Sequence, residues 1–244
     1  MCHVLQGMTM GGRMRRRAVL GAAGAAVAGR AGAQGAQARA EVDLLLVLAV
    51  DASGSIDGDE FQLQREGLAE AVSHPAVLAA IRSQPIGAIG IAMVEWGTPG
   101  GAETVMAWEM LRDGASAARV SDLLRTVPRS AQSYNAIGDA IAHAQALIAA
   151  APWSAVERVI DVSGDGPDMR SVIPAPTARD AAVAAGIVVN GLAIELSPVT
   201  RFGETLGEHY RSAVIGGPGA FVLTATDRRD FARAMRTKLV REIS

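Results

Sequence analysis

The chain has 244 residues, of which half are hydrophobic and only 4% are aromatic. It is therefore long and apolar enough for one domain with a buried core, which excludes a disordered chain. The formal net charge is −2, but five arginines and no acidic residue precede residue 39, so the rest of the chain is distinctly acidic. An acidic body argues against nucleic acid or an anionic membrane as the main partner, and it suits a cation.

The N-terminal segment has the three parts of an export signal. Arginines at 15–17 precede a weakly apolar Gly/Ala run over 21–29, and small-x-small cleavage sites follow at 31–33 and 36–38. The pattern Arg16-Arg17-x-Val19-Leu20 also resembles the twin-arginine signal, which exports folded proteins. The alternative reading of this segment is a basic, disordered tail.

These features predict that residues 1–38 are a cleaved export signal and that 39–244 form a single periplasmic or secreted domain. The apolar run is too short and too rich in glycine for a membrane-spanning helix, so no stable membrane anchor is expected. The only cysteine, Cys2, lies in the removed segment, so no disulfide is expected either. The sequence gives no basis for an oligomeric state.

The first predicted element of the mature chain is a strand. Residues 42–50 are almost uninterruptedly aliphatic, as in a central strand covered on both faces, and the run ends at Asp51. Asp57 is then placed to cap a helix, with Glu60 completing a capping box, and this helix is expected to run to about Ser73. A second short helix is expected to begin at Pro75 and end near Ile81.

Strands and helices continue to alternate along the chain. Further strands are expected at 86–96, 103–111, 156–162, 187–194 and 221–225, the second of them an edge strand reached through the Gly-rich turn 98–101. Further helices are expected at 115–127, 136–150, 177–185 and 227–243. This alternation predicts an α/β fold with a doubly wound, mostly parallel sheet flanked by helices. Such sheets bind ligands at the carboxyl ends of their strands, where Asp51 and Asp165 are expected.

A candidate cation site follows the first strand. Asp51, Ser53 and Ser55 supply one carboxylate and two hydroxyls within five residues, and Gly54 gives the backbone freedom that a tight turn needs. A hard cation such as Mg²⁺ prefers six oxygen ligands and retains some water, so a second loop, water and an outside ligand could complete this set. The alternative is that these side chains only cap the following helix.

These residues resemble the metal-ion-dependent adhesion site of von Willebrand factor type A domains. That site consists of Asp-x-Ser-x-Ser on one loop, a Thr on a second and an Asp on a third. Asp51, Ser53 and Ser55 match the first loop, and Asp165 matches the third. The resemblance implies bound Mg²⁺, or Mn²⁺ or Ca²⁺ in its place, and a protein partner whose acidic side chain completes the coordination.

The second loop departs from the family pattern, because the Thr position holds Asn135. An amide oxygen can coordinate a hard cation, so the resemblance implies Asn135 as the fifth ligand residue. Ser133 or Tyr134 could contribute instead. The substitution equally allows a weakened or vestigial site.

The mature chain is also similar to a bacterial domain-of-unknown-function family within this superfamily. The matching stretches are 46–55, 64–67, 94–96, 159–167, 178–182, 190–192 and 214–221, together with the terminal helix. This likeness supports the fold and leaves the activity open, because one fold serves many functions.

Three functions compete on these observations. A non-enzymatic, cation-dependent binding module is favoured. A Mg²⁺-dependent phosphohydrolase needs Asp-x-Asp, whereas Ser53 occupies the acid/base position and the only lysine, Lys238, lies in the final helix. The third possible function is that of a scaffold whose metal site is vestigial.

Two further features of the sequence could be either functional or purely structural. Glu95 and Trp96 end the second strand on the same rim as Asp51, and they are either part of the ligand-binding face or a surface Glu beside a packing Trp. The Gly-rich segment 216–219 precedes a strand and is not followed by Lys-Ser/Thr, so it is expected to be a turn and not a phosphate-binding loop.

Overall fold

The computed structural model describes residues 39–226 and 230–244. The expected export signal, 1–38, lies outside the described residues. None of the helices in the described part of the chain is long and apolar enough to cross a membrane.

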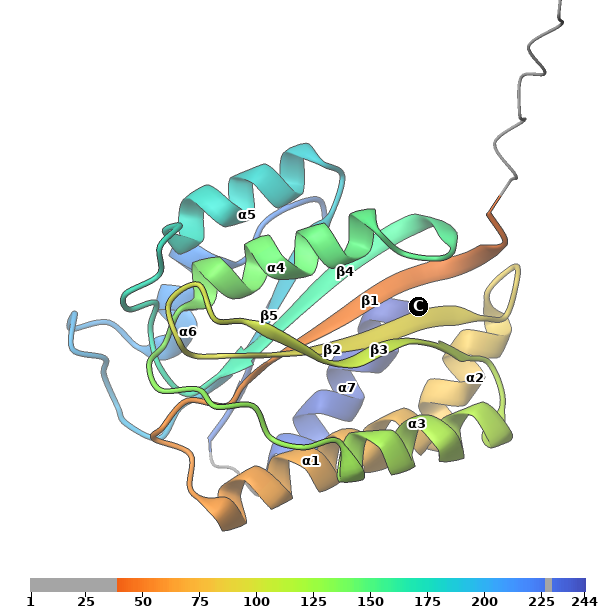
Figure 1. Ribbon diagram of the computed structural model, residues 1–244, viewed down its shortest axis with the longest axis horizontal. Coiled ribbons are helices and arrows are strands. Elements are labelled where there is room, and N and C mark those ends of the chain that lie inside the picture. Colours follow the sequence, from red (N-terminus) through yellow and green to blue (C-terminus); the bar gives the residue numbers. More distant parts are fainter. Residues whose placement is uncertain (1–38, 227–229) are drawn as a thin grey trace, which may run out of the picture. The chain divides into compact units, whose positions relative to one another are not determined.

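A six-stranded sheet forms the centre of the fold, with the strand order β3-β2-β1-β4-β5-β6 (Figure 1). Its strands are β1 (Glu41–Asp51), β2 (Ile89–Trp96), β3 (Glu103–Leu111), β4 (Ser154–Gly164), β5 (Val188–Ile194) and β6 (Val222–Ala225). Only β3, at one edge, is antiparallel to its neighbour. The mostly parallel sheet and the edge position of 103–111 are thus confirmed.

Helices cover both faces of this sheet. One face packs against α1 (Gly58–Ser73), α2 (Pro75–Ser83), α3 (Gly114–Thr126) and α7 (Phe231–Ile243). The other packs against α4 (Ile137–Ala149) and α5 (Ala175–Ala184). Figure 1 shows these two layers on either side of the strands. The fold is therefore the three-layer α/β arrangement that the sequence predicts.

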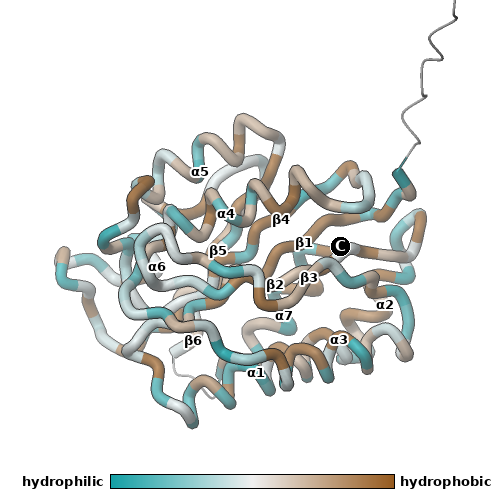
Figure 2. The backbone as a smooth tube through the Cα atoms, viewed as in Figure 1, coloured by the Kyte–Doolittle hydropathy of each residue, from teal (hydrophilic) through white to brown (hydrophobic). Residues whose placement is uncertain are grey.

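The apolar sequence of β1 explains its central position. Alternate side chains point to opposite faces of a strand. Leu46 and Leu48 pack on one face, whereas Leu45 and Val47 pack on the other. Figure 2 shows β1 as hydrophobic along most of its length. Burying a leucine side chain contributes about 2 kcal/mol, so a strand apolar on both sides is most stable between two helical layers.

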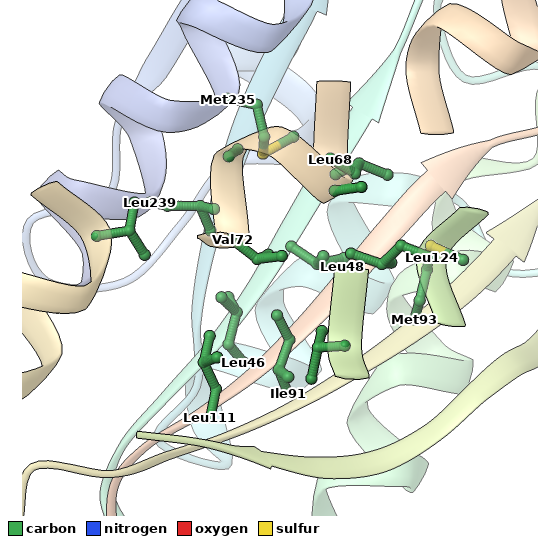
Figure 3. Packing of buried hydrophobic residues seen from close by; sticks show 14 of the residues in the cluster. Leu46, Leu48, Leu68, Val72, Ile91, Met93, Leu111, Leu124, Met235 and Leu239 are labelled. Atoms are coloured by element: carbon green, nitrogen blue, oxygen red, sulfur yellow. The ribbon is translucent and has the colours of Figure 1, made fainter. Parts of the chain in front are cut away.

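The larger core lies between the sheet and the helices of the first face. Figure 3 shows side chains from six elements meeting there. They are Leu46 and Leu48 of β1, Ile91 and Met93 of β2, Leu111 of β3, Leu68 and Val72 of α1, Leu124 of α3, and Met235 and Leu239 of α7.

The ends of the predicted elements agree with the structure where local hydrogen bonds define them. The backbone N–H of Glu60 donates to Asp57 Oδ1 at 2.9 Å, and the N–H of Asp57 donates to Glu60 Oε2 at 3.0 Å, which confirms the capping box. However, β2 begins at Ile89 and not at Ile86. The carboxylate of Asp43 accepts the N–H groups of Ile86 and Ala88 and holds this stretch in a turn.

Two short helices were not predicted. They are α6 (Leu206–His209) and the π-helix η1 (Tyr210–Val214). A capping box of Thr205 and Glu208 opens α6, so the sequence does contain a local signal for it. The predicted helix 227–243 is observed as α7 from Phe231, and 227–229 lie outside the described residues.

Candidate metal centre

Three loops meet at the carboxyl ends of the strands. The first loop, residues 51–57, begins at the last residue of β1; the second, residues 130–136, precedes α4; and the third, residues 165–174, follows β4. Backbone hydrogen bonds join them. Ala136 N–H donates to Gly97 O at 3.1 Å, and Met169 N–H donates to Asn135 O at 2.6 Å. The second loop is therefore fixed both to the end of β2 and to the third loop.

Asp51 lies at the base of the first loop and is fully buried. Its Oδ1 accepts the backbone N–H of Ser53 at 2.8 Å, and its Oδ2 accepts the N–H of Asp165 at 3.4 Å. The hydroxyls of Ser53 and Ser55 lie 3.0 Å apart. The turn that follows β1 thus gathers three oxygen-bearing side chains, and the third loop approaches the same carboxylate.

Asn135 adds an amide to this region. Its side chain packs so closely on Gly166 that a Cβ at that glycine would lie 2.3 Å from Asn135 Nδ2. Asn135 Oδ1 is buried and has no hydrogen-bond partner among the described residues. A buried amide oxygen without a donor is costly, and a cation would satisfy it.

The electrostatics also favour a bound cation. Burial, with a smaller effect from the nearby charge of Asp165, raises the pKa of Asp51 to about 7, and hydrogen bonds from Ser53 and Asp165 act in the opposite direction. Burial likewise raises the pKa of Tyr210, with Asp51 and Asp165 adding to the effect. The negative potential shared by two neighbouring carboxylates is the potential that a divalent cation would neutralise.

The oxygens of Asp51, Ser53, Ser55, Asn135 and Asp165 are hard ligands of the kind that Mg²⁺, Mn²⁺ and Ca²⁺ accept. Across residues 39–226 and 230–244, no group of three or more His, Cys, Asp or Glu side chains is placed to hold a metal. A cation here would therefore depend on hydroxyl and amide oxygens in addition to two carboxylates. The structure places all five predicted residues on adjoining loops, and their role as metal ligands stays a prediction.

The alternative ligands on the second loop have other contacts. The Ser133 hydroxyl lies 3.3 Å from Thr98 Oγ1, and the guanidinium of Arg170 stacks over the Tyr134 ring at 4.7 Å. Asn135 remains the candidate with an unsatisfied oxygen.

Arg129 holds the first loop in shape, a role that the sequence analysis missed. Its Nη2 donates to the carbonyl oxygens of Ala52, Ser53 and Ile56 at 2.9–3.0 Å. The guanidiniums of Arg129 and Arg65 also stack on the ring of Phe61, at 4.7 and 4.8 Å from its centroid. Nothing in the sequence near Arg129 indicates these contacts, because the loop carbonyls lie more than 70 residues away.

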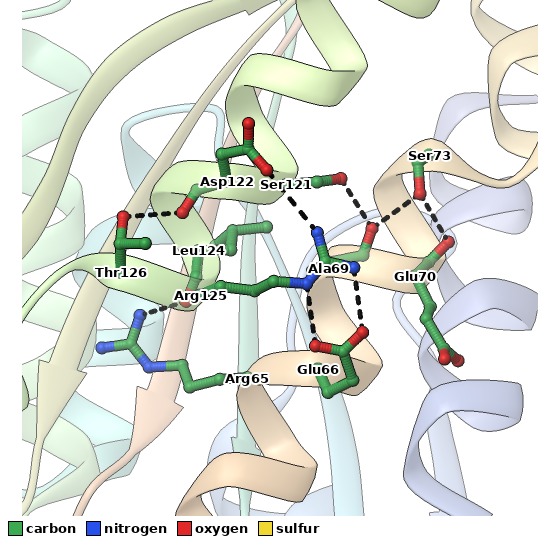
Figure 4. Close-up of polar contacts among 10 residues, drawn as sticks. All are labelled: Arg65, Glu66, Ala69, Glu70, Ser73, Ser121, Asp122, Leu124, Arg125 and Thr126. Atoms are coloured by element: carbon green, nitrogen blue, oxygen red, sulfur yellow. Dashed lines mark hydrogen bonds and ion pairs between the residues drawn. The ribbon is translucent and has the colours of Figure 1, made fainter.

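Glu95 is not a surface residue, so that alternative is wrong. It is fully buried, its Oε1 accepts Arg65 Nη2 at 2.6 Å, and its Oε2 accepts the N–H of Ser130 at 2.6 Å. Arg65 also donates to Leu124 O, one of several polar contacts that join α1 to α3 in Figure 4. Glu95 therefore connects α1 to the second loop. Trp96 is fully buried in the core, as the packing alternative expects.

Asp168 joins the third loop to two helices. Its Oδ1 accepts the N–H of Ile137 at 2.9 Å, and its Oδ2 accepts the N–H of Ala175 at 3.0 Å. A carboxylate between the N-termini of α4 and α5 also interacts favourably with both helix dipoles. This residue fixes the position of α4, and with it Asn135, relative to the third loop.

A sequence model of the family described as "Protein of unknown function (DUF1194)" matches residues 41–244. The chain belongs to this family. The match covers almost the whole described domain and agrees with the resemblance drawn from the sequence motifs. No curated protein matches the sequence.

Solved structures resemble the domain more broadly. Proximal thread matrix protein 1 from the mussel byssus aligns at 16% identity and a TM-score of 0.60, over 85% of this chain and 48% of that one. The pilus adhesin SpaC from Lactobacillus rhamnosus GG aligns at 12% identity and a TM-score of 0.60, over 84% of this chain and 31% of the adhesin. A von Willebrand factor type A protein from Catenulispora acidiphila aligns at 20% identity and a TM-score of 0.55, over 83% of this chain and 43% of that protein.

These likenesses confirm the fold as that of von Willebrand factor type A domains. The chain spans less than half the length of each of these proteins. A further structure of the mussel protein, with a TM-score of 0.59, has a zinc occupied MIDAS motif.

Proposed function

We propose that this protein is an exported, non-enzymatic binding module whose metal-ion-dependent adhesion-like site holds a divalent cation and recruits an acidic partner protein. The observation that carries the proposal is the placement of Asp51, Asp165 and the unsatisfied Asn135 Oδ1 on adjoining loops. A cation held by two carboxylates and neutral oxygens keeps open coordination positions, and a carboxylate from outside can fill one of them.

Exposed apolar side chains around the site support a protein partner. Nine large hydrophobic residues of the described chain are exposed, and six of them lie on the second and third loops or on the loop after β5, which lines pockets together with Asp165 and Asp168. These six are Tyr134, Val172, Ile173, Leu196, Val199 and Phe202. Exposed apolar residues gathered in one region mark interaction surfaces. A partner that presents an acidic side chain among apolar residues would match both the cation and its surroundings.

Export and metal use rest on different support. The basic and apolar N-terminal pattern supports export to the periplasm or beyond. Fold neighbours described as a pilus adhesin and as a byssal thread matrix protein are consistent with a role outside the cytoplasm. The zinc occupied MIDAS motif of the mussel protein supports a divalent cation at the corresponding loops.

Calorimetric titration of Mg²⁺, Mn²⁺, Ca²⁺ and Zn²⁺ into the purified chain tests the cation step. We expect at least one cation to bind in the micromolar to millimolar range and Asp51→Asn to abolish binding. Asp59→Asn is the matched control, because it removes an exposed carboxylate from α1 and should leave the affinity unchanged. If the wild-type chain binds no cation up to about 10 mM, the adhesion-site mechanism is wrong.

An Asn135→Thr variant tests the departure from the family pattern. If Asn135 is a ligand, threonine should preserve binding, whereas Asn135→Leu should weaken it about tenfold or more. Unchanged affinity in the leucine variant would remove Asn135 from the ligand set.

A further inference from the structure

A cavity lies at the opposite end of the sheet from the candidate metal centre, at the amino ends of β4 and β5. Its volume is about 510 Å³, within the range of small-molecule sites. Its apolar wall includes Val159 of β4, Ile187 and Val188 at the start of β5, and Phe221 before β6. The cavity exists because β4 extends past the start of β5: their pairing begins only at Val159 and Val188.

A cluster of buried charges borders this cavity. Lys238, the only lysine of the chain, is fully buried and pairs with Asp161 at 2.7 Å and with Glu242 one turn along α7. Asn190 Nδ2 donates to Glu242 Oε1 at 2.9 Å. Two carboxylates thus share one ammonium, which leaves the cluster one positive charge short of neutrality when both are ionised. Buried charges of this kind contribute little to stability on balance, so their presence calls for another reason.

Glu242 connects the charged cluster to the cavity. Glu242 is 7% exposed and lines the cavity. Its Oε2 is buried and has no hydrogen-bond partner among the described residues, whereas its Oε1 is occupied by Asn190 and Lys238. If the Glu242 carboxylate turns toward the cavity, a ligand that donates an N–H to it would satisfy Oε2, and a positively charged donor would also neutralise the cluster.

Two arginines on the cavity wall give it a second charge preference. Arg158 is half-buried and donates Nη1 to Ala185 O at 3.4 Å, and the exposed Arg241 stacks over the Phe221 ring at 3.8 Å. Only Glu157 opposes them among the outer lining residues. A simple amine would be repelled by these guanidiniums, whereas a molecule with a carboxylate at its other end would be attracted.

We propose that this cavity binds a small zwitterion with an apolar side chain, such as a free apolar amino acid. Its ammonium pairs with the carboxylate of Glu242, its carboxylate faces Arg158 and Arg241, and its side chain packs on the apolar wall. This site is independent of the metal centre, because none of its lining residues belongs to the three loops at the other end of the sheet.

Calorimetric titration of the purified chain with L-leucine and L-phenylalanine tests the proposal. N-acetyl-L-leucine lacks the ammonium and isoamylamine lacks the carboxylate, so each should bind at least tenfold more weakly than L-leucine. Failure of both amino acids to bind at about 10 mM, or equal binding of the acetylated compound, would overturn the proposal.

Two variants assign the contacts. Glu242→Gln removes the charge and should reduce leucine affinity at least tenfold; circular dichroism checks that it is folded. Arg241→Gln changes an exposed residue and should reduce the preference for L-leucine over isoamylamine. Asp59→Asn is the control, since it changes an exposed residue of α1 that does not line the cavity, and it should leave leucine binding intact. Unchanged binding in both the Glu242 and the Arg241 variants would contradict the assignment.

Discussion

At the scale of single residues, the candidate metal centre depends on groups that are not ligands. Arg129 donates three hydrogen bonds to carbonyls of the first loop, and Glu95 holds the start of the second loop through Ser130. Charged side chains can organise loop backbone in this way because hydrogen bonds to a charged donor or acceptor are about twice as strong as neutral ones. The positions of Asp51 and Ser53 are therefore set partly by residues far away in the sequence.

Replacing Arg129 tests this positioning role. We expect Arg129→Gln to weaken cation binding about tenfold and to lower the free energy of unfolding by about 1–3 kcal/mol, because it leaves loop carbonyls unsatisfied. Arg129→Lys keeps the charge but not the planar fork, so it should recover only part of the loss. Calorimetry and urea unfolding measure the two effects. An Arg129→Gln protein that binds cations with wild-type affinity would show that the loop keeps its shape without this contact.

Glu242 should make stability depend on pH. Burial raises its pKa from 4.5 to about 7 in the folded protein, with the neighbouring charge of Asp161 adding to the shift and Lys238 opposing it. Between these values the folded state holds more protons than the unfolded state, so the free energy of unfolding falls as pH rises from about 4.5 to 7. Asp51 and Asp161 contribute in the same direction, since the pKa of each is also raised by burial.

The Glu242→Gln variant isolates this contribution. Its unfolding free energy should decline less between pH 5 and 7.5 than that of the wild type, by on the order of 2 kcal/mol. Urea unfolding across this pH range measures the difference. Identical pH slopes in the two proteins would mean that Glu242 titrates normally.

At the scale of helices and strands, close backbone approaches position the site. Gly138, in the first turn of α4, faces the loop between β4 and α5 so closely that a Cβ there would lie 1.8 Å from Ile173 O. Asp139 then accepts the N–H groups of Val172 and Ile173, both at 2.9 Å. The start of α4 is thus locked against the third loop, which keeps Asn135 beside Gly166.

Glycine substitutions at matched helix positions test this packing. Gly138→Ala should destabilise the protein by about 2–4 kcal/mol, because backbone must move to admit the methyl group. Gly58→Ala, at the start of α1, meets nothing within 4 Å and should change stability by less than about 1 kcal/mol, with stabilisation expected. Urea unfolding of both variants provides the comparison. Similar stabilities would indicate that the α4 contact relaxes at little cost.

At the scale of the whole molecule, the parallel sheet separates two polar regions by the length of its strands. The candidate metal centre lies at the carboxyl ends of β1 and β4, and the Lys238 cluster lies beneath the cavity at the amino ends of β4 and β5. The described domain is otherwise built around two apolar cores, one on each face of the sheet. A ligand at either end that binds only the folded state would stabilise the whole domain.

Cation binding should therefore raise the melting temperature. At a concentration one hundred times the dissociation constant, the cation should stabilise the fold by about 2.7 kcal/mol, and a chelator should reverse the effect. In Asp51→Asn the melting temperature should not respond to the cation. Differential scanning fluorimetry with and without the cation measures this. A wild-type protein that is equally stable in saturating cation and in chelator would contradict binding to the folded state.

The sequence by itself determined the features that depend on neighbouring residues. The aliphatic run of β1 and the capping box of Asp57 and Glu60 specify local structure through contacts within a few residues. Asp51 and Asp165 follow parallel strands, so their common location at one edge of the sheet could be predicted from the alternation of strands and helices. The short helix α6 was missed despite its own capping box, because four residues carry almost no periodic signal.

Only the tertiary structure decided which polar groups are buried and what satisfies them. Arg65 and Glu95 are 30 residues apart, Asn190 and Glu242 are 52 apart, and each pair meets only when separate elements pack together. The sequence does not distinguish a charged residue in water from one in a core, whereas the free energy of the charged side chain differs by several kcal/mol between the two environments. Burial and the choice of partner are properties of the packed fold, and so Glu95 and Lys238 could be understood only after the elements were in place.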